Sequence, residues 1–424
     1  MGTNQKKQGW LAQSGGRTSA SLAGKKGLNS ASLEREVVSC LQDLIRIPSP
    51  LGNEIAVADY LVPLLRQAGF SVRMVAADKS RPNIIASRGK GPELALCCHM
   101  DTVPAGDGWT LAPFSGQRKA GKVYGRGAVD NKGPLAATLI AGSRTAFPGK
   151  LTLVFFAEEE TGSALGMQVV STVLKPRLAL IPDIGGEMRH IAVGEKGLLF
   201  VKVASIGKQA HGSSPHQGVN AIDGMMLFLS ELRALQGAKG QGPCGSMATI
   251  SSSTRRLFSA PTCNLGIIKG GSLPNMVPGM AEATLDFRYL PGQSRQGIIA
   301  MLRAAGVSAK RKGAKTRFGY TVLSDQRPVL YDSKVAQAAT DIIVKETRRV
   351  TGRTATLKGL SGSTVGKFLG HAGVPVLGIG CGKSPQMHAA DEHIAVRELV
   401  LFTRLTQAII NGIGEQWGQQ NIRV

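Results

Sequence analysis

Two short polar clusters in the first third of the chain contain residues that could bind a metal ion. The apolar run at residues 94–98 ends at His99 and Asp101, and Asp130 follows in a glycine-rich turn. Ionisable side chains are costly to bury unless they are paired or bind a metal. Imidazole and carboxylate groups are common ligands of divalent cations such as zinc. The two clusters therefore indicate a divalent metal held at the edge of a sheet.

Three further apolar runs, at residues 151–157, 178–181 and 374–379, also lead into acidic or histidine residues. The residues that follow these runs are Glu158, Glu159, Glu160, Asp183 and His388. In open α/β sheets, ligands bind in the crevice outside the carboxyl ends of the strands. Taken singly, an acidic strand end is often a solvated cap, and a lone histidine is usually structural. The repeated pattern predicts that all these side chains converge with the first two clusters.

The elements that must position these residues belong to an α/β fold. The run at 151–157 is typical of a strand buried on both faces, because it is continuously apolar and bounded by glycine and charge. Amphipathic patterns predict flanking helices at residues 32–46, 54–68, 134–145, 334–348 and 395–411. We therefore expect an α/β fold in which helices flank a sheet.

The middle of the chain has a different order of elements. It reads as strand 198–206, helix 220–235, strands 264–269 and 281–289, helix 294–305 and strand 318–323. That order is typical of a small α+β unit with an antiparallel sheet. We expect a catalytic domain in two parts, 32–194 and 325–424, with an inserted domain at 195–324.

The N-terminal residues 1–31 are predicted to be a disordered basic tail. They contain no acidic residue, and their lysines and arginine stand among glycine and serine. They lack the pattern of a secretory signal peptide, and the alternative is an organellar transit peptide. The six cysteines form no C-x-x-C pair, which favours a reducing cytoplasm. No apolar run approaches the length of a membrane span, so no membrane association is expected.

The formal net charge of +23 has two interpretations. One is nucleic-acid binding through contacts to phosphates. The basic residues are scattered, however, apart from a cluster around Lys310, Arg311, Lys312 and Lys315, and no nucleic-acid-binding motif is present. We therefore favour a generally basic surface that attracts anionic substrates.

Eight motifs, in order over residues 32–412, resemble the co-catalytic zinc aminoacylase/carboxypeptidase family. They read HMDTVP, GRGAVDNKG, EEETGS, IPD, AHGSSPHQGVNAI, PNMVPG, LDFR and HAADEH. That family includes acetylornithine deacetylase, succinyl-diaminopimelate desuccinylase, glutamate carboxypeptidase and several dipeptidases. The resemblance implies a zinc-exopeptidase-like sheet with flanking helices. It also implies that the inserted domain is a ferredoxin-like lid that forms a homodimer.

The resemblance further implies a site for two zinc ions, which cobalt or manganese could replace. Asp130 would bridge both metals. His99 and Asp183 would complete one site, and Glu160 and His388 the other. Two metals about 3.5–4 Å apart can make hydroxide available near neutral pH and polarise an amide carbonyl.

Other roles follow from the same resemblance. Glu159 would be the general base, and Asp101 would orient the His99 imidazole. His211 resembles a histidine that reaches a neighbouring active site to stabilise the oxyanion. Asn275 and Arg288 resemble substrate-binding residues.

The activity implied is hydrolysis of the amide bond of an N-acyl amino acid. A carboxypeptidase or dipeptidase activity on short peptides is the alternative within the family. A basic nucleic-acid-associated protein with an inactive hydrolase fold is the alternative of a different class. We also expect Asp391 and Glu392, beside His388, to lie in a solvated loop. Ser363, Thr364 and Val365 stand where the family often has an aspartate, so the family's substrate contacts at this loop do not carry over, whereas its metal ligands do.

Overall fold

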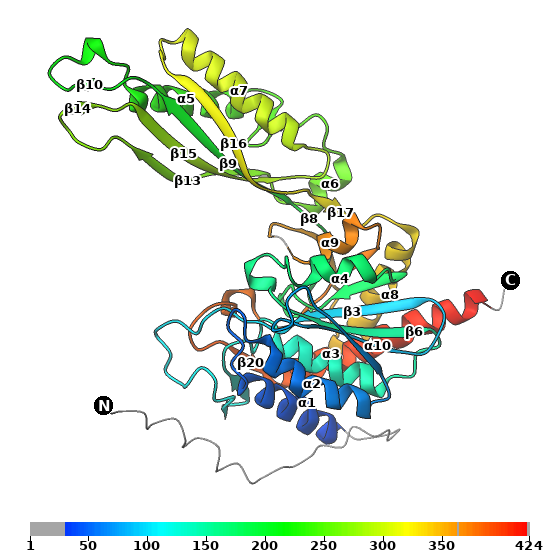
Figure 1. Cartoon of the computed structure of the whole chain (residues 1–424). Helices are drawn as coiled ribbons and strands as arrows, with labels where there is room; N and C mark the ends of the chain where they lie inside the picture. The colour runs from blue at the N-terminus through cyan, green and yellow to red at the C-terminus, as the bar shows by residue number, and fades with distance from the viewer. Residues whose placement is uncertain (1–29, 363, 422–424) are drawn as a thin grey trace, which may run out of the picture.

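The computed structural model describes residues 30–362 and 364–421. The predicted tail lies outside these residues, except for Ser30 and Ala31, which begin helix α1 (Ser30–Ile45). Figure 1 shows a larger unit that contains both ends of the described chain, and a smaller unit that projects from it. The larger unit has a nine-stranded mixed sheet and the smaller one a four-stranded sheet.

The sheet of the larger unit has the strand order β1-β2-β6-β3-β7-β19-β8-β17, and β18 also pairs with β8. The strands are β1 (Ser71–Val75), β2 (Asn83–Arg88), β3 (Glu93–His99), β6 (Lys150–Phe156), β7 (Leu178–Ile181), β8 (His190–Glu195), β17 (Val329–Leu330), β18 (Thr356–Leu360) and β19 (Val376–Gly378). The central strands β6, β3, β7 and β19 run parallel to one another. This arrangement confirms the predicted α/β fold.

Helices cover both faces of this sheet. One face packs against α1, α2 (Glu54–Gln67), α3 (Lys132–Arg144), α8 (Lys334–Thr351) and α10 (Val396–Asn421). The other face packs against α4 (Met167–Val173) and α9 (Gly366–His371). Leu94 and Leu96 of β3 point to the first face, and Ala95 and Cys97 to the second, because side chains alternate along a strand. Two-sided burial is the reason that these strands read as continuous apolar runs.

A small three-stranded sheet extends the larger unit beside the strand ends. It has the order β20-β5-β4, with β4 (Arg118–Lys119), β5 (Lys122–Tyr124) and β20 (His393–Ala395). In this sheet β20 pairs with β5 in antiparallel register. The pairing joins the segment after His388 to the segment before Asp130.

The smaller unit has the β-α-β-β-α-β order of a ferredoxin-like fold. Its strands β9 (Gly197–Ile206), β13 (Thr262–Gly270), β15 (Met280–Tyr289) and β16 (Arg317–Gln326) form an antiparallel sheet in the order β13-β15-β9-β16. Helices α5 (Ala221–Gly237) and α7 (Arg295–Arg311) pack on one face, around buried Phe228, Leu302 and Phe287. All six predicted elements of this region are present. A short helix, α6 (Ser252–Leu257), and the two-stranded pairs β10-β14 and β11-β12 are added to them.

The chain passes between the two units twice, from β8 to β9 and from β16 to β17 (Figure 1). Buried polar groups hold these crossings. Lys367 on α9 donates a hydrogen bond to Gln326 at the end of β16 (3.1 Å), and its Nζ lies 3.9 Å from Glu195. Glu195 also accepts hydrogen bonds from the Tyr331 hydroxyl (3.1 Å) and the Thr364 amide (2.7 Å). The side chains of both Lys367 and Glu195 are 2% exposed.

Within the described ranges, no helix has both the length and the apolar character needed to cross a membrane. All six cysteines are free thiols.

Candidate metal centre

The parallel strands bring the predicted polar residues together beyond the carboxyl ends of the central strands of the larger sheet. His99 is the last residue of β3, and the three glutamates follow β6. Asp183 lies just beyond β7, and His388 lies in the segment after β19. Because β3 pairs with both β6 and β7, and β7 with β19, these ends are neighbours in space. The polar side chains that follow the apolar runs therefore converge, as predicted.

The Asp130 carboxylate lies between two histidines. Its Oδ1 is 3.0 Å from His99 Nε2, and its Oδ2 is 3.2 Å from His388 Nε2. Each imidazole therefore faces a different oxygen of the same carboxylate. A carboxylate that bridges two metal ions presents its oxygens in this way.

A further carboxylate accompanies each histidine. Asp183 Oδ1 is 3.7 Å from His99 Nε2, and Glu160 Oε2 is 3.0 Å from His388 Nε2. The two groups of three share Asp130 and match the two ligand sets that the resemblance implied. Ligand atoms of His99, Asp130 and Glu160 all lie within 4.8 Å of one another.

The chemistry of this cluster fits metal ions. Among the described residues, the buried Oε1 atom of Glu160 has no hydrogen-bond partner. A buried carboxylate oxygen without a partner is costly, and a cation would satisfy it. The cluster offers imidazole nitrogens and carboxylate oxygens, a donor set that suits zinc, manganese or cobalt.

Glu159 is next to the cluster without belonging to either group of three. Burial, together with the negative charge of Asp183, holds the pKa of the Glu159 carboxyl well above its usual range. A carboxylate with a raised pKa is a better proton acceptor than an exposed one. Glu159 is therefore suited to accept and return a proton beside the metal cluster.

Asp101 contacts both His99 and the glutamate loop. The His99 Nδ1 donates to the Asp101 backbone carbonyl (2.9 Å) and lies 3.4 Å from the Asp101 carboxylate. The carboxylate accepts the backbone N–H groups of Glu159 and Glu160, both at 3.1 Å. With Nδ1 donating, the His99 Nε2 is the nitrogen available to a metal. Asp101 thus fixes the ring and also places the two glutamates.

The prediction that Glu392 lies in a solvated loop is wrong. Its side chain is fully buried and accepts hydrogen bonds from the backbone N–H groups of Gly127 (3.0 Å), Val129 (2.7 Å) and Asp130 (3.0 Å). It also pairs with the buried Arg126 guanidinium at 2.7 Å. Glu392 therefore holds the turn that presents Asp130.

Arg126 extends this support to the second histidine. Its guanidinium donates to the backbone carbonyls of His388 (3.2 Å) and Ala389 (3.2 Å). It also lies 5.2 Å from the centre of the Trp109 ring. One buried ion pair thus positions both the Asp130 turn and the His388 segment. Asp391, by contrast, lies at the surface, where its carboxylate accepts hydrogen bonds from the backbone N–H group and the hydroxyl of Thr110.

Asn131 is a second supporting residue that the sequence analysis missed. Its buried side-chain amide donates to Asp183 Oδ1 (2.6 Å) and to the Pro182 carbonyl (3.1 Å). This contact directs the Asp183 carboxylate toward His99. The GRGAVDNKG motif contained the signal, since Asn131 directly follows Asp130 there.

Among the described residues, His211 and Asn275 are not brought to the cluster within one chain, and Arg288 makes no hydrogen bond or ion pair with it. His211 ends β10 (Ala210–His211), which pairs with β14 (Met276–Val277) directly after Asn275. Figure 1 shows both strands at the end of the smaller unit away from the larger one. Arg288 lies at the other end of that unit, where it is the register partner of Leu198, close to the crossing from β8 to β9. Its guanidinium pairs with the Asp286 carboxylate at 2.9 Å. The roles of these three residues stay predictions.

The family model described as "Peptidase family M20/M25/M40" matches residues 95–412. A succinyl-diaminopimelate desuccinylase of Rhizorhabdus wittichii is 27% identical over 389 residues, which are 88% of this chain and 96% of that protein.

Two solved structures have a similar fold. A tripeptidase of Staphylococcus aureus has a TM-score of 0.71 at 20% identity, with 90% of this chain and 99% of that chain covered. A protein of Bacillus subtilis described as a dinuclear metal binding peptidase of the M20 family has a TM-score of 0.65 at 15% identity, with 90% and 99% covered.

Proposed function

Because the chain belongs to peptidase family M20/M25/M40, and is therefore a hydrolase of amide or peptide bonds, we propose that it is a two-zinc deacylase of N-acyl amino acids. The observation that supports this proposal most strongly is the position of Asp130, with one carboxylate oxygen facing each histidine. In this proposal His99, Asp130 and Asp183 hold one zinc, and Asp130, Glu160 and His388 hold the other.

When bound, zinc ions would polarise the amide carbonyl and lower the pKa of water. The protein residues then have distinct tasks. Glu159 accepts the proton of the attacking water and returns it to the nitrogen of the leaving amine. Asp101 keeps the His99 ring and the Glu159 backbone in place. The leaving amine departs as an amino acid with its carboxylate free.

Arg288 is the proposed contact for a substrate carboxylate. Its guanidinium is partly exposed and pairs with Asp286, so a carboxylate would have to replace Asp286 as its partner. The excess of basic residues also favours the approach of anionic substrates. The name of the R. wittichii relative supports an N-succinyl amino acid as substrate.

A peptidase activity is the second candidate. It is supported by the names of the similar structures, which include a tripeptidase. Both activities use the same cleavage chemistry and differ in the group on the acyl side of the bond. The direct test is a hydrolysis screen with zinc, using N-acetyl and N-succinyl amino acids against dipeptides and tripeptides.

We expect the N-acyl amino acids to be cleaved with the higher kcat/KM. Preferred cleavage of peptides would favour the second candidate. No hydrolysis of any of these compounds, together with salt-sensitive RNA binding, would favour the nucleic-acid-associated alternative.

The role of Glu159 has its own test. Glu159→Gln should remove turnover but retain zinc, whereas Asp130→Asn should lose zinc. Zinc content measured by mass spectrometry would separate the two effects. If Glu159→Gln kept a kcat close to that of the wild type, Glu159 would not be the base.

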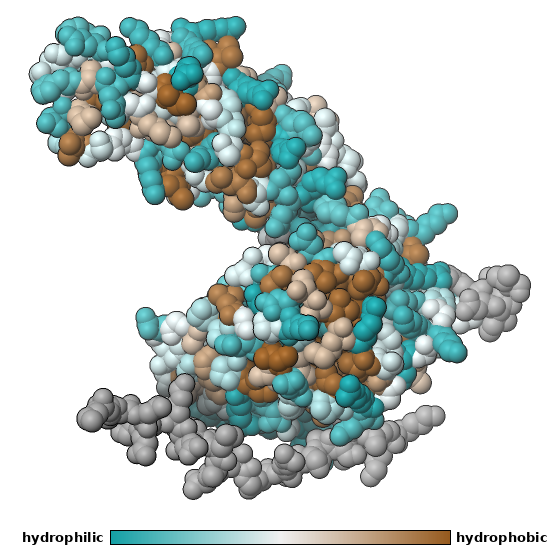
Figure 2. All heavy atoms as spheres, viewed as in Figure 1, coloured by the Kyte–Doolittle hydropathy of each residue, from teal (hydrophilic) through white to brown (hydrophobic). Residues whose placement is uncertain are grey.

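The smaller unit is the proposed dimer interface. β13 is an edge strand, and its Ile267 and Ile268 are 51% and 55% exposed. Figure 2 shows further apolar side chains on the surface of this unit. Exposed apolar edge strands pair readily with a second chain. His211 and Asn275, at the end far from their own metal cluster, would then serve the site of the second chain.

A mixing experiment tests this arrangement. Glu159→Gln and His211→Ala should each be inactive alone. Random exchange of subunits would give about half heterodimers, each with one intact site of two, and about a quarter of wild-type activity. No recovery of activity on mixing, with exchange verified by mass, would refute the shared site. Ile268→Glu should yield monomers in analytical ultracentrifugation.

The compartment proposed is the cytoplasm. The six free thiols support this, because disulfides are rare in reducing compartments.

A further inference from the structure

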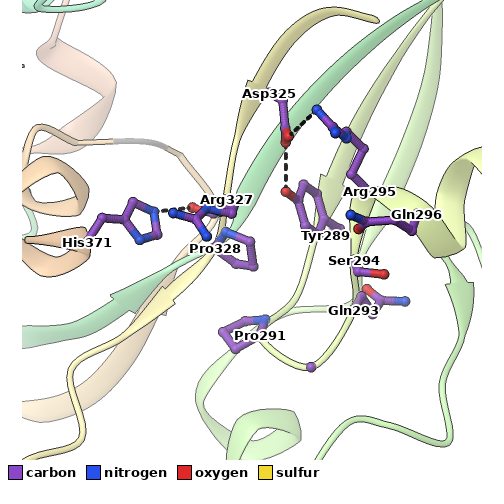
Figure 3. A pocket seen from close by; sticks show the side chains of 11 residues that line it. Tyr289, Pro291, Gln293, Ser294, Arg295, Gln296, Asp325, Arg327, Pro328 and His371 are labelled. Atoms are coloured by element: carbon purple, nitrogen blue, oxygen red, sulfur yellow. Dashed lines mark hydrogen bonds and ion pairs between the residues drawn. The ribbon is translucent and has the colours of Figure 1, made fainter.

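A hollow of about 670 Å³ lies at the junction of the two units, and the proposed hydrolysis does not use it. It is lined by Tyr289 at the end of β15, the start of α7, the segment 325–328 and His371 of α9. Figure 3 shows these side chains around the opening, with His371 coming from the larger unit and Arg295 from the smaller one. Its size is within the range of small-molecule sites in proteins.

The hollow is rich in hydrogen-bond donors. Arg295 and Arg327 line it from two different elements, and the amide of Gln296 lies beside them. Among residues 30–362 and 364–421, the Arg327 guanidinium makes no hydrogen bond or ion pair, and it is exposed. An arginine without a partner offers five N–H donors in a fixed fork, which matches the oxygens of phosphate or carboxylate.

The one carboxylate among the described residues that line the hollow, and the Arg327 backbone carbonyl, already accept hydrogen bonds. The Asp325 carboxylate accepts the Tyr289 hydroxyl (3.0 Å) and pairs with Arg295 (3.3 Å), as Figure 3 shows. The Arg327 backbone carbonyl accepts His371 Nε2 (3.1 Å). Burial lowers the pKa of the His371 imidazole and so favours its neutral form. The lining therefore has one net positive charge, which comes from Arg327.

The position of the hollow connects it with both units. Arg327 and Pro328 form one of the two crossings, and His371 contacts that crossing from α9. Tyr289 is next to Arg288 on β15, and adjacent side chains of a strand point to opposite faces of its sheet. A ligand beside Tyr289 would therefore lie on the other side of β15 from Arg288.

We propose that this hollow is a binding site for a small anion with phosphate or carboxylate oxygens, held by Arg327 and Arg295. The volume exceeds that of inorganic phosphate, so the natural ligand is a larger molecule with an anionic group against Arg327. Pro291 and Pro328 provide an apolar wall for the rest of it. Because the ligand contacts both units, its binding favours one relative placement of them.

The test is calorimetric titration of the full-length, zinc-loaded protein with inorganic phosphate and, separately, with succinate. Sodium chloride keeps the ionic strength constant. We expect saturable binding of at least one anion, and the two titrations distinguish the phosphate from the carboxylate source. Arg327→Ala should weaken this binding at least about tenfold, since it removes charge-assisted hydrogen bonds. Arg303→Ala, an exposed arginine of α7 outside the hollow, is the matched control and should change the Kd less than about twofold.

A second measurement tests the connection between the units. Amide hydrogen exchange at residues 195–197 and at residues 326 and 327 should slow when the anion binds to the wild type, and stay unchanged in Arg327→Ala. Circular dichroism establishes that the variants are folded. Absence of saturable binding up to about 10 mM, or equal weakening by Arg303→Ala, would overturn the proposal. Binding that persists in Arg327→Ala would assign the anion to the metal cluster and would overturn it as well.

Discussion

Replacing Glu392 with glutamine should weaken both the fold of the larger unit and its hold on metal. Glu392 uses one oxygen for the N–H groups of Val129 and Asp130, and the other for Gly127 and Arg126. Glutamine has the same shape but only one acceptor oxygen. In one orientation its NH2 group would face the N–H groups of Val129 and Asp130, and in the other it would face the Gly127 N–H group and the Arg126 guanidinium. Two donors would therefore lose their acceptor in either case.

The size of the effect follows from burial. A buried donor without a partner costs about 1–3 kcal/mol, and loss of one partner of a buried ion pair costs about 3–5 kcal/mol. Arg126 and Glu392 are 2% and 0% exposed, so solvent does not compensate for either loss. The effects overlap on one side chain and do not add. We expect the unfolding free energy to fall by about 3–5 kcal/mol.

The effect on metal follows from the same contacts. The turn and the His388 segment would both lose a fixed position, although no ligand is removed. Loss of supporting hydrogen bonds around metal ligands typically weakens metal affinity by about 10–100-fold. Urea unfolding followed by circular dichroism measures the first effect, and competition with a zinc chelator of known affinity measures the second.

Glu415→Gln is the matched control, because Glu415 is an exposed residue in the last part of α10, about 28 Å along the helix from its first residue. It should change stability by less than about 0.5 kcal/mol. If Glu392→Gln behaved like this control in both assays, the reasoning that Glu392 supports the site would be refuted.

Three further predictions address the metal, pH and the smaller unit. Removal of metal with EDTA should abolish hydrolysis and lower the melting temperature, because Asp130, Asp183 and Glu160 then lack a cation. Added zinc should restore both properties. Hydrolysis that survives complete removal of zinc would contradict a metal centre. Burial is the main cause that lowers the pKa of Lys367 to about 8, opposed by Glu195. As pH rises, the folded chain therefore loses this proton at a lower pH than the unfolded chain does. The unfolding free energy should therefore rise between about pH 8 and about pH 10.5, by up to about 3 kcal/mol more than that of Lys367→Met. If the urea midpoints of the two proteins changed equally with pH over that range, the prediction would be wrong. Leu302→Ala, in the core of the smaller unit, should cost about 2–5 kcal/mol in unfolding free energy and leave zinc content unchanged; coupled loss of zinc would show that the two units do not unfold separately.

The parts of the fold and site that follow from the sequence are those with a local signal. His99 and Asp183 stand directly after apolar runs, and their convergence follows from the rule for strand ends. The six elements of the smaller unit were each predicted close to the residues over which they occur.

Glu392 had no such signal. The segment around it is polar and reads as solvated, and its burial depends on donors more than 260 residues earlier in the chain. The lysine at 367 was not identified as buried for the same reason, since its partners come from β8 and β16. The pairing of Arg288 with Asp286 was also missed, although it could have been predicted, because residues two apart on a strand share a face.

The distribution of the cluster along the chain has a consequence for synthesis on the ribosome. His99 and Asp130 are made early, but His388 and Glu392 are among the last residues of the larger unit. The helix that follows them, α10, packs against α1 and α3, which are made first. A nascent chain therefore has neither a complete second metal position nor a fixed Asp130 turn. In the proposed two-zinc arrangement, the site and its activity would therefore be complete only after the segment that contains His388 and Glu392 has left the ribosome.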